Sequence, residues 1–208
     1  LHFWQFCCNI SILKMAHFAR SCKGTEQLLL FLTTIRGISM EKEMAEVYCG
    51  NGRGKTTLAI GQALRASSQG KSVIIIQFLK GNERRELDFL EELDQLDIKI
   101  FRFEKMETCY DQLNEEEQAE EKRNILNGLN FARKVIATQE CDFLVLDEIL
   151  GLLDKHIATV DMVTELLKQK DESMHIILTG NRVDQGLLDY VDRVTTITTL
   201  ERDKMPLV

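Results

Sequence analysis

Residues 50 to 57 read GNGRGKTT and have the composition of a loop that holds phosphate. The strand-like run EVYC precedes them and the helix-like run LAIGQALRASS follows them. Glycines permit backbone conformations closed to other residues, so successive N–H groups can converge on an anion at the positive end of the following helix. Lys55 adds a mobile positive charge, and Thr56 offers a hydroxyl to a magnesium ion that bridges the phosphates. A simple turn before a helix is the alternative, but the strand–loop–helix context favours nucleotide binding.

The residues expected to contact the nucleotide through this loop are Gly50, Asn51, Gly52, Arg53, Gly54, Lys55, Thr56 and Thr57. The loop departs from the usual pattern G-x-x-x-x-G-K-[ST] at its start, where that pattern requires a glycine at position 49. Cys49 stands there, and Gly50 is the first glycine. The glycines are therefore re-spaced by one residue.

A second element suited to phosphate chemistry is FLVLDE, which runs from Phe143 to Glu148. Four apolar residues followed by two carboxylates resemble a Walker B strand. Asp147 would hold magnesium or its water ligands, and Glu148 would be a second carboxylate for the metal or a base that orients water. A pair of acids at the end of a strand is common by itself. Together with the phosphate loop, it predicts a metal site formed by Thr56, Asp147 and Glu148.

Strand-length apolar runs alternate with helix-like stretches through residues 40 to 208. The expected strands are Ala45–Cys49, Ser72–Leu79, Ile98–Phe103, Asp142–Asp147, His175–Thr179 and Arg193–Thr198. The clearest helix begins at Asn114, which can cap the N–H of Glu117, and runs to Ala137. Runs that are apolar throughout, such as VIII and FLVL, indicate strands buried on both faces. We therefore predict a three-layer α/β domain with a parallel sheet and a ligand site at the carboxyl ends of its strands.

The composition narrows the class of partner. The chain has 208 residues, 44% of them hydrophobic, which suits a single substantial core over residues 40 to 208. A net charge of −7 argues against a surface for nucleic acid or membrane and favours a small-molecule partner. Six cysteines without a C-x-x-C pair fit a reducing cytoplasm.

Residues 1 to 39 differ from the rest of the sequence. They carry four Lys or Arg residues against one acid, Glu26, and the single tryptophan, Trp4. Their longest apolar run is far shorter than the ~20 residues that span a bilayer. Because MEKEMAEVY from Met40 would make a plausible start, we expect this segment to be a non-native or disordered extension. A lid or a targeting helix is the alternative.

The ordered set GNGRGKTT, QFLKG (77 to 81), LVLDE (144 to 148) and LTGN (178 to 181) resembles the P-loop family of corrinoid adenosyltransferases. That family carries TGNGKGKTT, QF-[IL]-KG, LVVLDEL and a late TGR, and the resemblance extends from residue 46 to about 206. It implies a P-loop NTPase fold of RecA-like type. It also implies a magnesium-dependent cytoplasmic homodimer that moves the adenosyl group of ATP to Co(I) of a corrinoid, with a reductase supplying Co(I).

The resemblance also implies roles for individual residues. Lys80, Asn181 and Arg182 would join the phosphate loop in binding ATP, and Glu148 would serve magnesium. Catalytic roles would belong to Lys55, Glu148 and Tyr110. Where the family has an aromatic pair in G-F-T-W-E, this sequence retains Tyr110 alone, and the family's TGR reads TGN with Arg182 displaced by one position. Another P-loop NTPase or phosphotransferase, or a non-catalytic nucleotide- or corrinoid-binding module, remains an alternative.

Overall fold

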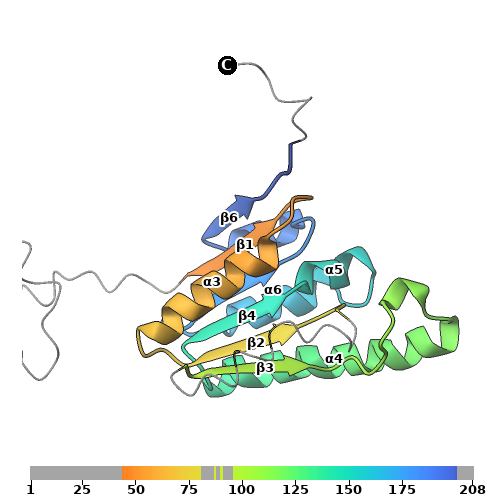
Figure 1. Ribbon diagram of the computed structural model, residues 1–208, viewed down its shortest axis with the longest axis horizontal. Helices are drawn as coiled ribbons and strands as arrows, with labels where there is room; N and C mark the ends of the chain where they lie inside the picture. Colours follow the sequence, from red (N-terminus) through yellow and green to blue (C-terminus); the bar gives the residue numbers. More distant parts are fainter. Residues whose placement is uncertain (1–43, 81–86, 88–89, 91–95, 201–208) are drawn as a thin grey trace, which may run out of the picture. The chain divides into compact units, whose positions relative to one another are not determined.

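The computed structural model describes residues 44–80, 87, 90 and 96–200, which belong to one compact unit over 43–208 (Figure 1). The expected extension over residues 1 to 39 lies outside the described residues.

The unit is built on a parallel sheet of six strands in the order β3-β2-β4-β5-β1-β6. The strands are β1 (Ala45–Cys49), β2 (Val73–Gln77), β3 (Ile98–Arg102), β4 (Phe143–Asp147), β5 (His175–Thr179) and β6 (Arg193–Thr196). Every residue of β1, β2 and β4 is buried, as the uninterrupted apolar runs predict for strands covered on both faces. The predicted parallel α/β fold is confirmed.

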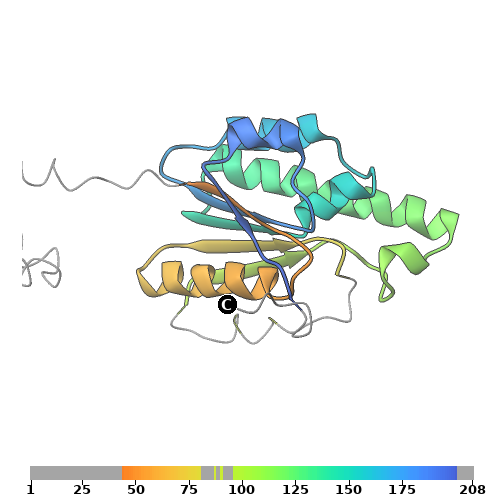
Figure 2. The ribbon, with the colours of Figure 1, turned by 90° about the horizontal axis from the view of Figure 1, so that it is seen from above.

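Helices cover both faces of this sheet, which gives three layers (Figure 2). On one face lies α3 (Lys55–Ser68), which buries Ala59, Ala63 and Ala66 against β1, β2 and β4. The other face carries α4 (Glu115–Thr138), α5 (Ile149–Asp154), α6 (Val160–Lys168) and the 3-10 turn η4 (Gln185–Tyr190). Another 3-10 turn, η3 (Tyr110–Gln112), precedes α4.

The long helix α4 begins as the sequence predicts. The side chain of Asn114 accepts the N–H of Glu117 at 3.0 Å, and the Glu117 carboxylate accepts the N–H of Asn114 at 3.0 Å. This reciprocal pair satisfies two N–H groups that the first helical turn would leave without a partner. The helix ends at Thr138, and the backbone of its C-cap residue, Gln139, is left-handed (φ 53°).

The strand ends differ slightly from the predicted ones, and the difference at β2 matters for the site. The prediction extended this strand to Leu79, but it ends at Gln77 because Leu79 has a left-handed backbone (φ 58°). This turn carries the chain out of the sheet at Lys80. The strands β3 and β6 end at Arg102 and Thr196, before the predicted Phe103 and Thr198, and β4 begins at Phe143.

Strand β5 lies between β1 and β4 in the sheet. The phosphate loop follows β1 and the two carboxylates follow β4, so both elements reach the same edge of the sheet with Thr179 of β5 between them. None of the helices in the described ranges is both long and apolar enough to cross a membrane.

Candidate nucleotide and metal site

The phosphate loop is held against the chain segment that follows β6. Gly50 has a φ of 109°, and a Cβ at this position would lie 2.3 Å from the carbonyl oxygen of Ile197. A Cβ on Gly52 would lie 2.7 Å from the same oxygen, which accepts the N–H of Gly52 at 2.9 Å. The N–H of Gly50 donates to the carbonyl of Asn181 at 2.8 Å. Both glycines are therefore required for this close approach of three backbone segments.

Helix α3 begins directly after the loop, and its N-terminus is open to an anion. Gly54 is the N-cap residue, with a φ of 102° and no side-chain cap. The N–H groups of the first turn, from Lys55 onward, have no acceptor within the helix. The Lys55 ammonium donates to the carbonyls of Gly50 at 2.7 Å and Gly52 at 3.1 Å, so it spans the loop from inside. This arrangement is suited to binding phosphate.

Asp147 is the centre of a buried polar cluster at the edge of the sheet. Its side chain is 1% exposed. One carboxylate oxygen accepts the hydroxyls of Thr56 at 2.8 Å and Thr179 at 2.7 Å. The other oxygen accepts the Gln77 amide at 3.1 Å and lies 3.5 Å from the Lys80 ammonium.

The oxygen atoms of this cluster suit a magnesium ion. Thr56 and Asp147 supply a hydroxyl and a carboxylate, the hard oxygen donors that magnesium prefers. Lys80 also donates to the hydroxyl of Thr56 at 3.2 Å, so a cationic group already lies where the ion's positive charge would be needed. The residues present therefore fit the expected ion.

Glu148 follows Asp147 with a left-handed backbone (φ 63°) and begins α5. Its N–H donates to the hydroxyl of Thr179 at 2.8 Å. Burial raises the pKa of its carboxyl above the ordinary value, Lys80 opposes this rise and the charge of Asp147 adds to it. A cation bound next to Glu148 would favour its ionised form and offset the cost of burial.

A pocket of about 420 Å³ lies beside this cluster. Its lining residues are Leu79, Lys80, Asp111, Glu148, Gly151, Asp154, Lys155 and Asn181. Besides the Lys80–Asp147 pair, ion pairs of its lining residues join Lys155 to Asp111, and Arg182 to Asp154 at 2.9 Å. Most of the lining is polar or charged, which suits a ligand with several hydrogen-bonding groups.

The structure brings the principal predicted residues together. Lys55, Thr56, Lys80, Asp147 and Glu148 meet at the carboxyl ends of β1, β2 and β4. Asn181 lines the pocket, and the exposed side chain of Arg182 pairs with Asp154, which also lines it.

Four other predicted residues do not join the cluster around Asp147. Asn51, Arg53 and Thr57 are exposed. The half-buried side chain of Tyr110 packs against the core cluster on the α4 face, and the neighbouring Asp111 lines the pocket.

Several residues at the site were not assigned by sequence reasoning. Gln77 and Thr179 lie within the quoted motifs QFLKG and LTGN, but no property of the letters alone indicates that both bind Asp147. Arg102 and Glu104, at the end of β3, have no motif signal at all. Arg102 donates to Gln77 at 2.9 Å, and Glu104 accepts the N–H of Leu79.

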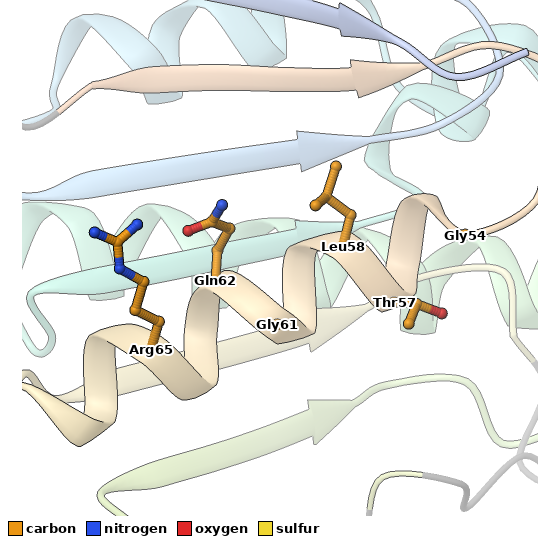
Figure 3. Close-up of a pocket in the computed structure, with 6 residues that line it drawn as sticks. All are labelled: Gly54, Thr57, Leu58, Gly61, Gln62 and Arg65. Carbon is orange, nitrogen blue, oxygen red and sulfur yellow. The ribbon is translucent and has the colours of Figure 1, made fainter.

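The sequence also contained no indication of a shallow hollow of about 540 Å³ that lies along α3. Figure 3 shows Leu58, Gln62 and Arg65 in a row along one side of this helix, with Thr57 near the phosphate loop on the other side. The Cβ position of Gly61 in this hollow has no atom within 4 Å.

Glu104 gives a prediction for the dependence of stability on pH. Burial raises its pKa from the ordinary 4.5 to about 7, the Leu79 N–H opposes the rise, and Glu121 of α4 adds to it. The folded protein then holds this proton more tightly than the unfolded chain does. The stabilisation of the folded state by the protonated Glu104 is complete below pH 4.5 and is lost as the pH rises through about 7.

Glu104→Gln should remove this loss, which is on the order of 2–3 kcal/mol. Urea unfolding at several values between about pH 5 and pH 8 measures the difference between wild type and variant. The wild-type free energy of unfolding should fall relative to the variant as the pH rises. A difference that stays constant over this range would contradict the raised pKa.

The fold and the site define a P-loop nucleotide-binding protein. The family model of the ATP:corrinoid adenosyltransferases BtuR/CobO/CobP matches residues 41–204, and the chain belongs to this family. The corrinoid adenosyltransferase of Escherichia coli strain K12 is 28% identical over 162 residues, which cover 76% of this chain and 77% of that protein. The corrinoid adenosyltransferase CobA of Salmonella typhimurium strain LT2 is 28% identical over 160 residues, with the same shares covered.

A solved structure confirms the fold class. The KaiC-like protein PH0186 of Pyrococcus horikoshii OT3 is similar with a TM-score of 0.50 and 19% identity, over 75% of this chain and 71% of that one. At this identity the likeness concerns the P-loop α/β fold alone.

Proposed function

We propose that this protein transfers the 5′-deoxyadenosyl group of ATP to Co(I) of a corrinoid and releases triphosphate. One observation carries the proposal: in a chain of this family, the phosphate loop, the Asp147 cluster and a polar pocket meet at one edge of the sheet. The phosphate loop would hold the triphosphate and the pocket would receive the part of the substrates where the new bond forms.

The proposed step is a displacement at carbon. Co(I), the reduced substrate, donates both electrons of the new cobalt–carbon bond to the ribose 5′ carbon and is formally oxidised to Co(III). The bond between that carbon and the triphosphate oxygen breaks, and its electron pair leaves with triphosphate. Because no proton is transferred in this step, the protein needs to align the two reactants and stabilise charge on the leaving group.

The residues of the site can perform both tasks. The N–H groups at the start of α3 and the ammonium groups of Lys55 and Lys80 would neutralise the triphosphate. Asn181, whose carbonyl accepts the N–H of Gly50, and the neighbouring Arg182 would complete ATP binding. Thr56, Asp147 and Glu148 would hold magnesium, which when bound supplies positive charge to the phosphate oxygens.

The family resemblance also suggests the oligomeric state, the location and the pathway of the protein. We infer a homodimer in the cytoplasm that serves adenosylcobalamin biosynthesis or salvage and depends on a reductase for Co(I).

One observation favours a second function, hydrolysis or transfer of the terminal phosphate. Glu148 lies beside Asp147, and the pKa of its carboxyl is raised. A raised pKa suits a carboxylate that accepts a proton from an attacking water. In that case the protein would form ADP without corrinoid. A module that binds nucleotide or corrinoid without catalysis would form neither product.

The products of the reaction distinguish these functions. The protein is incubated with ATP and magnesium, with and without chemically reduced cobalamin, and the nucleotide and phosphate products are separated. We expect triphosphate in step with a light-sensitive adenosylated corrinoid, and little consumption of ATP when corrinoid is absent. Release of ADP and phosphate at an enzyme-like rate without corrinoid would establish the second function instead.

Tyr110→Ala tests whether this aromatic ring lies near cobalt, as the family resemblance implies. We expect it to impair corrinoid turnover more than ATP binding, because the ring would shield cobalt and make no contact with the phosphates. Turnover with cobalamin and a titration with ATP measure the two effects. If both fall equally, or neither changes, Tyr110 has only the packing role that its contact with the core indicates.

A further inference from the structure

We propose that Arg102 and Glu104, at the carboxyl end of β3, are positioning residues for the metal and phosphate site. Both act through the QFLK segment that ends β2. Arg102 positions Asp147 through its hydrogen bond to Gln77, which we call the first relay. Glu104 positions Lys80 through its hydrogen bond to Leu79, which we call the second relay. The inference rests on the proposed role of Asp147 as the magnesium-binding carboxylate. Neither residue was identified from the sequence, and neither lines the polar pocket.

The first relay crosses the sheet in register. Gln77 of β2 is paired with Arg102 of β3 on one side and with Asp147 of β4 on the other. The Arg102 Nε donates to the Gln77 amide oxygen at 2.9 Å, and the Gln77 amide nitrogen donates to Asp147 at 3.1 Å. Gln77 is 4% exposed, so no bulk water competes for its amide.

The hydrogen-bonding groups on either side of Gln77 determine how its amide must be oriented. A guanidinium has only donors, and an ionised carboxylate has only acceptors. One orientation of the Gln77 amide therefore satisfies both neighbours, with its oxygen toward Arg102 and its nitrogen toward Asp147. Without Arg102 the amide could rotate and direct its oxygen at Asp147, which would repel the carboxylate and remove one of its donors.

The second relay holds the turn that leaves β2. Leu79 has a left-handed backbone (φ 58°), which a side chain of this size rarely adopts and which persists only when its surroundings require it. The Glu104 carboxylate accepts the N–H of Leu79, and the N–H of Phe78 donates to the carbonyl of Asp147 at 2.9 Å.

The next residue is Lys80, which is 19% exposed and contacts both Thr56 and Asp147. Glu104 thus fixes the backbone that directs the Lys80 ammonium into the site. Arg102 and Glu104 are two residues apart near the end of the same strand, so both relays start from one place in the fold.

The two relays should matter most when magnesium binds. Asp147 and Thr56 must then exchange hydrogen bonds for metal contacts without moving apart. We therefore expect loss of either relay to raise the magnesium concentration needed for ATP binding. Binding of the phosphates by the loop and α3 should be retained, because neither relay contacts Lys55 or the loop glycines.

The experiment measures ATP binding as a function of magnesium concentration in the full chain, without corrinoid. Arg102→Met and Glu104→Ala should each raise the half-saturating magnesium concentration by about three- to tenfold, which corresponds to the loss of one hydrogen bond. Glu104→Gln keeps an oxygen for Leu79 and Arg102→Lys keeps a donor for Gln77, so these should retain most of the wild-type behaviour. Lys99→Ala, an exposed position on the same strand, is the control.

Double variants test whether each residue acts through the proposed partner. In the Gln77→Ala background, Arg102→Met should have little further effect, and in the Lys80→Ala background the same should hold for Glu104→Ala. Urea unfolding verifies that each variant is folded. If the first variants do not fold, Arg102→Leu and Glu104→Met replace them, because leucine supplies no donor for Gln77 and methionine supplies no carboxylate for Leu79.

Asp147→Asn separates the possible failures. If it abolishes the magnesium dependence while Arg102→Met and Glu104→Ala leave it unchanged, the positioning inference is wrong. Fully additive effects in the double variants would also overturn it. If Asp147→Asn itself changes nothing, the metal assignment and this inference fail together, and the separate product assay still decides between adenosyl transfer and hydrolysis.

Discussion

Lys55→Ala is expected to weaken ATP binding in the presence of magnesium by roughly ten- to a hundredfold, because a charge-assisted hydrogen bond to phosphate contributes about 1.5–3 kcal/mol. The structure adds a second reason. The Lys55 ammonium donates to the carbonyls of Gly50 and Gly52, so its removal also leaves two carbonyl oxygens inside the loop without this donor. A titration with ATP, followed by calorimetry, measures the loss.

Lys99→Ala is the matched control for this variant. It removes the same charge from an exposed position near the start of β3, away from the phosphate loop. The control should bind ATP as the wild type does. An unchanged affinity in Lys55→Ala would contradict the assignment of residues 50 to 57 as the phosphate loop.

Gly50→Ala should abolish most ATP binding while leaving the rest of the fold in place. Its backbone has a φ of 109°, and the added Cβ would lie 2.3 Å from the carbonyl oxygen of Ile197. The left-handed conformation alone costs an ordinary residue about 1–2 kcal/mol, and relief of the overlap requires the backbone of the loop to move. Displaced N–H groups no longer converge on one anion, so we expect at least a tenfold loss of affinity.

Gly61→Ala and Gly54→Ala separate the causes of this loss. Gly61 lies within α3 and its Cβ position is open, so alanine there should leave binding unchanged and stabilise the helix by roughly 0.5–1 kcal/mol. Gly54 has a φ of 102° but no atom within 4 Å of its Cβ position, so alanine there tests backbone strain without the overlap. If Gly50→Ala binds ATP as well as Gly61→Ala does, the contact with Ile197 has no role in the loop.

Local features of the sequence sufficed to predict the elements and the main chemical groups. The run GNGRGKTT indicates a phosphate loop because glycine, lysine and threonine have properties that do not depend on distant parts of the chain. Asn114 and Glu117 predict the start of α4 for the same reason, since both partners of the cap are three residues apart. Uninterrupted apolar runs predict strands buried on both faces, and the fully buried β2 and β4 confirm this.

The extent of β2 could not be predicted in this way. The run SVIIIQFL reads as one strand, but Leu79 turns into a left-handed conformation that Glu104, in the segment that follows β3, helps to hold. The re-spaced glycines show the same limit. Positions 50 and 52 require a residue without a side chain because the backbone of Ile197 approaches the loop, and only the tertiary structure shows this approach.

The sequence by itself thus determined the phosphate loop, the acidic pair Asp147–Glu148 and the class of fold. The tertiary structure decided which side chains meet around Asp147. Thr56, Gln77 and Thr179 reach it from three different elements, and Arg102 lies one strand further away. The physical reason is that parallel strands are joined by long crossover connections, so which strands become neighbours depends on contacts between segments far apart in the sequence and not on any one local pattern.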